Sequence, residues 1–157
     1  MKRNFVYAGL ALATICVASL LPLQAHAAQC SQSSVAGNWA YTYNGTVFVP
    51  NPLPVAAVGN AHLDSSGNVA GTQTHTLAGQ TEVEDISGTY TVNKDCTGSM
   101  TVSVTLNGQL LRTATVNVAY DTNVNHARMI FTSLVLPDGT NLPAVITVDV
   151  SRVTTKE

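Results

Sequence analysis

Beyond residue 30, apolar and polar residues alternate with a period of two, in short runs that turn residues separate. In the first run, residues 37–43, the aromatic side chains Trp39, Tyr41 and Tyr43 occupy the odd positions. Such alternation with aromatic enrichment is typical of a strand that buries one face. No part of this region shows a convincing helical period, and the pattern therefore predicts an all-β protein.

The runs predict about eight strands that follow one another along the chain. Short turns join them, and Asn107-Gly108 is the strongest hairpin signal among these turns. Sequential strands with short connections form an antiparallel meander, and eight of them can close into a barrel without exposed edges. We therefore predict an eight-stranded antiparallel up-and-down barrel, with strands over residues 37–43, 55–63, 68–77, 86–92, 100–106, 110–120, 126–136 and 142–153.

Two segments between these strands are expected to lie outside the sheet. Residues 50–54 contain three prolines, which cannot donate to a central strand, and are predicted as a rim loop. Asn44-Gly45, shortly before them, either bends the first strand or starts a hairpin with residues 46–49. Residues 82–85 read Glu-Val-Glu-Asp, and we interpret them as a solvated acidic loop in preference to a calcium site.

The first 27 residues have the features of a secretory signal peptide. Lys2 and Arg3 precede an apolar run over residues 5–23, and a small-x-small pattern ends at Ala27. We predict cleavage after Ala27 or Ala28, which leaves a single β-barrel domain over residues 28–157. The mature protein is expected to be secreted or periplasmic, without a membrane anchor.

Cysteine usage agrees with an oxidising compartment. Cys16 lies in the predicted signal peptide, so Cys30 and Cys96 are expected to form a disulfide, with two free thiols as the alternative. The chain-entropy model assigns a bridge over so long a loop about 4 kcal/mol of stability. Gln29 before Cys30 argues against lipid attachment there, because a small residue is required at that position. Residues 31–36 are interpreted as a linker.

The charged residues exclude several classes of function. Without Lys2 and Arg3, five basic residues face nine acidic ones, so the mature net charge is −4. Such a chain offers no basic surface for nucleic acid or for an anionic membrane. The spacing of His62, His75 and His126 has no metal-site signature. There is also no Gly-x-Ser-x-Gly nucleophile elbow, and we predict no metal, no cofactor and no nucleic-acid partner.

Two resemblances add to this picture. Gly37-x-Trp39 together with Arg152 resembles the pairing in lipocalin-like (calycin) barrels, and the resemblance implies that Arg152 packs over Trp39 and closes the barrel. Residues 30–104 resemble a group of small secreted bacterial proteins with barrels of the allene oxide cyclase-like kind. The likeness implies a fold and a compartment, carries over no catalytic residues, and rests on Ala56-Ala57-Val58-Gly59, Asp64-x-x-Gly67-Asn68-Val69-x-Gly71 and Gly88-Thr89-Tyr90-Thr91-Val92-Asn93-x-Asp95-Cys96-Thr97-Gly98.

The interior of an eight-stranded barrel is either filled by side chains or holds one small ligand. We place the odd residues of 68–77 and the even residues of 86–92 and 110–120 inside. Small inward residues, Ala57, Gly59, Ala61, Gly71, Gly88 and Ala114, are expected to leave space. The candidate ligand-binding residues are the inward polar ones, Tyr41, Tyr43, Gln73, His75, Arg112 and Tyr120. The alternative is a core closed by Trp39, Tyr41, Tyr90, Met129 and Phe131.

Three functional hypotheses follow from this interior. The leading one is a protein that binds a small apolar or amphipathic molecule without transforming it. The second is a cyclase- or isomerase-type enzyme, in which His75 or Arg112 supplies a polar group, although an inward histidine is more often structural. The third is a filled, non-catalytic barrel that offers its loops to a partner.

Overall fold

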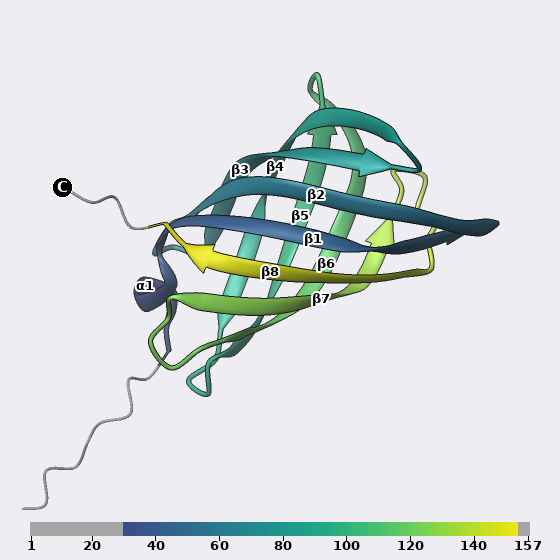
Figure 1. Cartoon of the computed structure of the whole chain (residues 1–157). Coiled ribbons are helices and arrows are strands. Elements are labelled where there is room, and N and C mark those ends of the chain that lie inside the picture. Colours follow the sequence, from purple (N-terminus) through teal and green to yellow (C-terminus); the bar gives the residue numbers. More distant parts are fainter. Residues whose placement is uncertain (1–29, 154–157) are drawn as a thin grey trace, which may run out of the picture.

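The computed structural model describes residues 30–153, which form a closed antiparallel barrel of eight strands in sequence order (Figure 1). Each strand pairs with its neighbours along the chain, and the last strand pairs with the first to close the barrel. The predicted fold class is thereby confirmed, whereas the predicted signal peptide lies outside the described residues. The elements are α1 (Gln32–Val35), β1 (Gly37–Val49), β2 (Asn51–Leu63), β3 (Asn68–Leu77), β4 (Gln80–Val92), β5 (Thr97–Leu106), β6 (Gln109–Tyr120), β7 (His126–Val135) and β8 (Ala144–Arg152).

Alternate side chains of each strand point into the barrel, as the period of two predicts. On β3 the odd residues Val69, Gln73 and His75 are buried, and on β4 the even residues Ile86 and Tyr90 are buried. The even residues of β6 from position 114 onward are buried as well. The faces assigned from the sequence are therefore confirmed.

The rim loop predicted for residues 50–54 is wrong, because β1 and β2 form one long hairpin that pairs up to Val49 and Asn51. The strand tolerates Pro52 and Pro54 because their backbone N and C=O positions point away from β1. The carbonyl of Pro54 accepts a hydrogen bond from the Ala78 amide, so its backbone faces the β3 side. Pro52, two residues earlier, faces the same side beyond the end of β3. The missing N–H groups therefore interrupt no hydrogen bond between β1 and β2.

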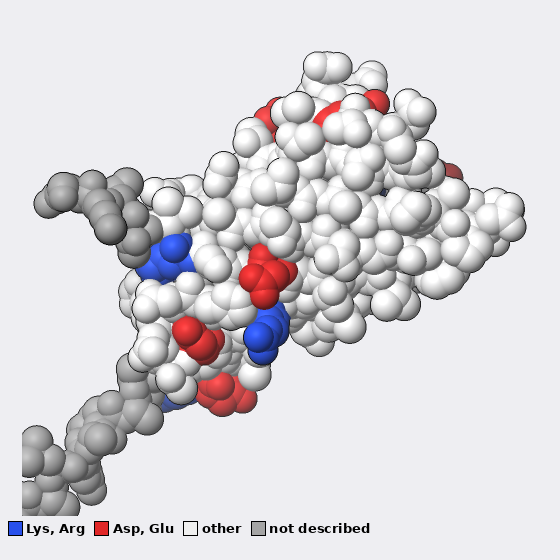
Figure 2. Space-filling view, in the orientation of Figure 1, with Lys and Arg blue, Asp and Glu red and all other residues white. Residues whose placement is uncertain are grey.

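This hairpin projects beyond the rest of the barrel, at the right of Figure 1. Gly45 lies within β1, so the hairpin within residues 44–49 does not form. A Cβ atom at Gly45 would lie 2.1 Å from the Val145 carbonyl oxygen of β8, which explains the glycine. Residues 37–63 contain no Lys, Arg, Asp or Glu, and Figure 2 shows the projecting end without charged side chains.

The segment expected to be a linker after Cys30 is instead the one-turn helix α1. Ser31 caps it in a reciprocal capping box with Ser34, and Val35 is fully buried. The Trp39 indole donates a hydrogen bond of 2.9 Å to the Val35 carbonyl, so α1 covers one end of the barrel. Within residues 30–153 there is no helix with the length and hydrophobicity needed to span a membrane.

Arg152, near the end of β8, lies over the Trp39 ring at 4.7 Å from its centroid. Its guanidinium also donates hydrogen bonds to the carbonyls of Ser34, Ala36 and Val124. The side chain thus joins α1, β1 and the β6–β7 loop at the covered end of the barrel.

The predicted disulfide between Cys30 and Cys96 is confirmed, with 66 residues of sequence separation. It joins the segment before α1 to the β4–β5 turn. Cys96 adopts a left-handed backbone with φ of 66°, and Asp95 supports this turn by accepting a hydrogen bond from the Thr97 amide. The bridge therefore fastens the start of the barrel to its middle strands.

Gly88 allows β4 and β5 to approach closely, and its replacement by alanine should destabilise the barrel. A Cβ atom there would lie 2.0 Å from the Thr101 carbonyl oxygen and 2.8 Å from the Val102 Cα atom. Because both atoms belong to backbone, we expect Gly88→Ala to lower the free energy of unfolding by about 2–3 kcal/mol. Urea denaturation measures this loss, and Ser87→Ala on the exposed face of the same strand is the control. Equal stabilities of the two variants would contradict the expectation.

Candidate functional site

The barrel encloses a cavity of about 80 Å³, and all eight strands contribute to its wall. Apolar side chains dominate this wall, among them Trp39, Met100, Met129, Phe131 and Val150. The polar residues that line the cavity are Tyr41, Tyr43, Gln73, Arg112 and Tyr120. Five of the six predicted ligand-binding residues therefore lie in the wall, and His75 does not.

The volume sets the size of molecule that the cavity can hold. One water needs about 10–15 Å³ of such space, and pockets for drug-sized ligands begin near ~300 Å³. The observed 80 Å³ lies between these values and is smaller than the ~150 Å³ of an apolar cavity that binds benzene, so a molecule of about one ring fits only if the wall adjusts. Met100 and Met129 in the wall have flexible side chains, which can adjust to the shape of a ligand.

The space comes from alanines and not from the glycines that the sequence suggested. Ala61 and Ala114 line the cavity. At Gly59, a Cβ atom would lie 2.6 Å from the Tyr41 ring, so this ring occupies the room that the glycine leaves. Gly71 and Gly88 instead face backbone atoms of the neighbouring strand. The expectation that these three glycines open the interior is therefore wrong.

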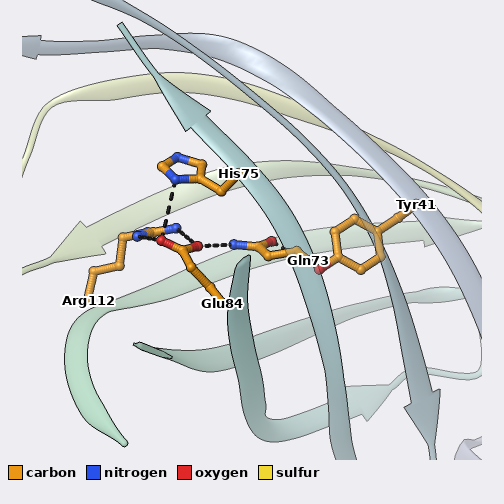
Figure 3. A network of polar contacts seen from close by, with 5 residues as sticks. All are labelled: Tyr41, Gln73, His75, Glu84 and Arg112. Carbon is orange, nitrogen blue, oxygen red and sulfur yellow. Dashed lines mark hydrogen bonds and ion pairs between the residues drawn. The ribbon is translucent and has the colours of Figure 1, made fainter. Parts of the chain in front are cut away.

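A row of paired residues across the sheet carries a polar network. Tyr41 of β1 is paired with Gly59 of β2, and Gly59 is paired with Gln73 of β3. Gln73 is in turn paired with Glu84 of β4. The Tyr41 hydroxyl donates to Gln73 Oε1 at 3.0 Å, and Gln73 Nε2 donates to Glu84 Oε2 at 2.7 Å (Figure 3). The strand register therefore orients the amide of Gln73 between a phenol and a carboxylate.

Glu84 is the centre of this network and is only 1% exposed. Arg112 of β6 donates to both of its carboxylate oxygens, at 2.8 Å and 2.6 Å. His75 Nδ1 lies 3.4 Å from Glu84 Oε1, and Figure 3 shows the three side chains converging. A bidentate pair of this kind is the strongest form of charged hydrogen bonding in proteins.

Glu84 is not among the residues predicted to bind a ligand, because the sequence predicts an acidic loop for residues 82–85 that leads into a strand. That expectation is wrong: these residues belong to β4, and Glu84 is buried while Glu82, Val83 and Asp85 are exposed. The sequence feature that identifies Glu84 is that Ile86, Gly88 and Tyr90 occupy even positions and face inward. Extending the inward even positions backwards by one step places Glu84 inside the barrel, where Arg112 is also expected.

The charges of this pair cancel at neutral pH. Burial tends to raise the pKa of the Glu84 carboxyl, but hydrogen bonds from His75, Arg112 and Gln73 outweigh it and lower the pKa from 4.5 to about 2. Burial likewise opposes the charge of Arg112, yet its contacts with Glu84 raise the pKa of the guanidinium. Burial also raises the pKa of the Tyr41 hydroxyl. Arg112, whose charge Glu84 neutralises behind it, and protonated tyrosine hydroxyls therefore line the cavity.

The low pKa of Glu84 predicts how stability depends on pH. Because the folded pKa of about 2 lies below the unfolded value of 4.5, the contribution is complete above pH 4.5 and is lost as the pH falls towards 2. The total is about 3 kcal/mol. Denaturation between pH 7 and 2 measures it as the difference between the wild type and a Glu84→Gln, Arg112→Met double variant. Surface carboxylates contribute equally to both proteins. If the free energies of unfolding of the two proteins changed in parallel between pH 7 and 2, Glu84 would not have a lowered pKa.

Tyr120 lies towards the covered end of the barrel, away from this network. Its ring centroid is 6.1 Å from that of Trp39, and the residue is 8% exposed. Among the described residues, its hydroxyl is the single buried side-chain oxygen or nitrogen without a hydrogen-bond partner. No group of three or more His, Cys, Asp or Glu side chains within residues 30–153 is arranged to hold a metal ion.

Comparisons with known proteins show only distant similarity. No protein-family model and no curated protein matches the chain. Among solved structures, the S-type phycobiliprotein lyase CPES from Guillardia theta aligns with a TM-score of 0.47 and 7% identity, over 83% of this chain and 97% of that one. Rv2717c from M. tuberculosis aligns with a TM-score of 0.33 and 16% identity, over 78% and 94%. Neither match is close enough to indicate a ligand or an activity.

Proposed function

We propose that the barrel binds one small apolar or amphipathic molecule in its interior and does not transform it. The observation that carries this proposal is the apolar cavity of about 80 Å³ among otherwise buried side chains. Protein interiors are normally packed as densely as organic crystals, and an empty cavity costs stability in proportion to its volume. A ligand offsets this cost by restoring the missing contacts. The cavity thus favours binding over the hypothesis of a filled, purely structural barrel.

The polar groups of the wall favour binding over catalysis. His75, the candidate acid or base, is absent from the wall. Arg112 uses both terminal nitrogens on Glu84, and Gln73 uses its amide between Glu84 and Tyr41. A cyclase or isomerase needs a polar group that is free to act on its substrate, and Arg112 and Gln73 are already engaged. The hydroxyl of Tyr120 is free, but burial raises its pKa, so it is a poor base.

The disulfide supports the proposal that the protein acts outside the cytoplasm. Bridges of this kind form and persist in oxidising compartments and are rare in reducing ones. Together with the predicted signal peptide, Cys30–Cys96 favours a secreted or periplasmic protein. Mass spectrometry of protein isolated from its host tests this, since export predicts an N-terminus after Ala27 or Ala28 and an oxidised bridge.

Intrinsic fluorescence tests binding, because Trp39 is the single tryptophan of the chain and lines the cavity. We expect saturable changes in its emission with toluene and similar ring-sized compounds. Ala114→Leu fills the cavity from β6 and should abolish the response. Ala119→Leu makes the same change on the exposed face of β6 and should preserve it. No saturable response in a folded wild type, or equal responses of the two variants, would overturn the proposal.

A further inference from the structure

The unpartnered hydroxyl of Tyr120 indicates what kind of polar group the ligand carries. Tyr120 lines the cavity, is 8% exposed, and its hydroxyl has no hydrogen-bond partner among residues 30–153. An unpaired buried hydroxyl destabilises a protein, and buried groups of this kind are rare in native structures. A ligand atom that pairs with the hydroxyl removes that cost.

The other polar side chains around the cavity leave a ligand little else to bind. The Tyr41 hydroxyl donates to Gln73, and Gln73 and Arg112 both donate to Glu84. The Trp39 indole donates to the Val35 carbonyl. Tyr43, the remaining polar residue of the wall, has its hydroxyl beside Arg112 and Gln73, both of which interact with it. A second polar atom on the ligand would therefore have to compete with an existing polar contact or remain unpaired, and either outcome weakens binding.

Water is a poor occupant for the position next to Tyr120. Buried waters typically make about three hydrogen bonds. The described side chains offer a water at this hydroxyl no second buried unpaired group. A ligand oxygen attached to an apolar ring satisfies the hydroxyl and also fills the apolar remainder of the cavity, which a single water does not.

The interior also selects against charge. Arg112 and Glu84 neutralise each other through two hydrogen bonds, so neither is available as a counter-ion. Burial raises the pKa of the Tyr120 hydroxyl, which therefore keeps its proton and can donate it. A charged ligand would lose its hydration without receiving an opposite charge.

We propose that the ligand is an uncharged, ring-sized molecule with one oxygen that accepts a hydrogen bond from Tyr120, such as a phenol, an alcohol or a ketone. This inference rests on the proposed binding function and narrows it to a chemical class. It makes Tyr120 the residue that determines specificity for a polar atom, while the apolar wall binds the ring.

Phenol and toluene test the inference, because they differ only in the group that would face the hydroxyl. Calorimetric titration gives the affinities of both compounds for the wild type and for Tyr120→Phe. We expect the ratio of the phenol to the toluene dissociation constant to rise about 3- to 10-fold in the variant, as one net hydrogen bond is lost. Tyr90→Phe is the control, since Tyr90 is buried outside the cavity wall and its hydroxyl donates to the Asp64 carbonyl.

The outcomes separate the inference from the function on which it rests. A rise of the ratio in Tyr120→Phe alone supports the inference. An unchanged ratio, with both compounds still bound, overturns it and leaves the binding function intact. Failure of both compounds to bind the folded wild type overturns both proposals. Tyr120→Phe removes an unpaired hydroxyl and keeps the ring, so we expect the variant to fold and thermal denaturation to confirm this.

Discussion

Replacing Arg112 with methionine should lower the free energy of unfolding by about 3–5 kcal/mol at neutral pH. The variant keeps a long apolar side chain in the wall but leaves Glu84, which is 1% exposed, without its bidentate partner. A buried carboxylate that has only His75 and Gln73 as neighbours must bear a large desolvation cost or take up a proton. Chemical denaturation at pH 7 measures the loss.

Two further variants make this test specific to the buried pair. Adding Glu84→Gln to Arg112→Met removes the stranded charge and keeps an acceptor for Gln73, so we expect stability to return to within about 1–2 kcal/mol of the wild type. Arg128→Met, on the exposed face of β7 opposite Asp149, should change stability by less than about 0.5 kcal/mol. A loss as small for Arg112→Met as for Arg128→Met would show that the pair contributes no more than a surface contact.

Removing the disulfide should cost about 4 kcal/mol, a large part of the stability of a small domain. The bridge closes a loop with 66 residues of separation, and the entropy of the unfolded chain rises when the loop is opened. We expect Cys30→Ala, Cys96→Ala to unfold at a correspondingly lower urea concentration than the oxidised wild type.

A reductant provides the control for this variant. Reduction should destabilise the wild type by the same amount and leave the double alanine variant unchanged. If the variant is as stable as the oxidised wild type, the barrel closes without its bridge and the entropic argument fails.

The period of two predicted the barrel itself because alternation is a direct consequence of a pleated strand with one buried face. The inward positions of β3, β4 and β6 followed from that rule alone, and so did the placing of Gln73 and Arg112 inside. The disulfide followed from cysteine number and from the predicted compartment.

The remaining features depend on the register between strands, which single-strand patterns do not contain. Pro52 and Pro54 read as a loop, since the pattern does not show which way their missing N–H groups face. The inward glycines were expected to leave empty space, but the Tyr41 ring occupies that space at Gly59 and backbone atoms occupy it at Gly88. Glu84 was assigned to a loop because it lies in an acidic run, although its even position places it on the inward face of β4.

The most direct test of a ligand site inside the barrel is a crystal structure of the protein grown with iodobenzene, whose iodine is located by anomalous scattering. We expect one iodobenzene within the barrel, in contact with Trp39 and Phe131 of the cavity wall. Iodine on the outer surface alone, with the interior unchanged, would contradict it.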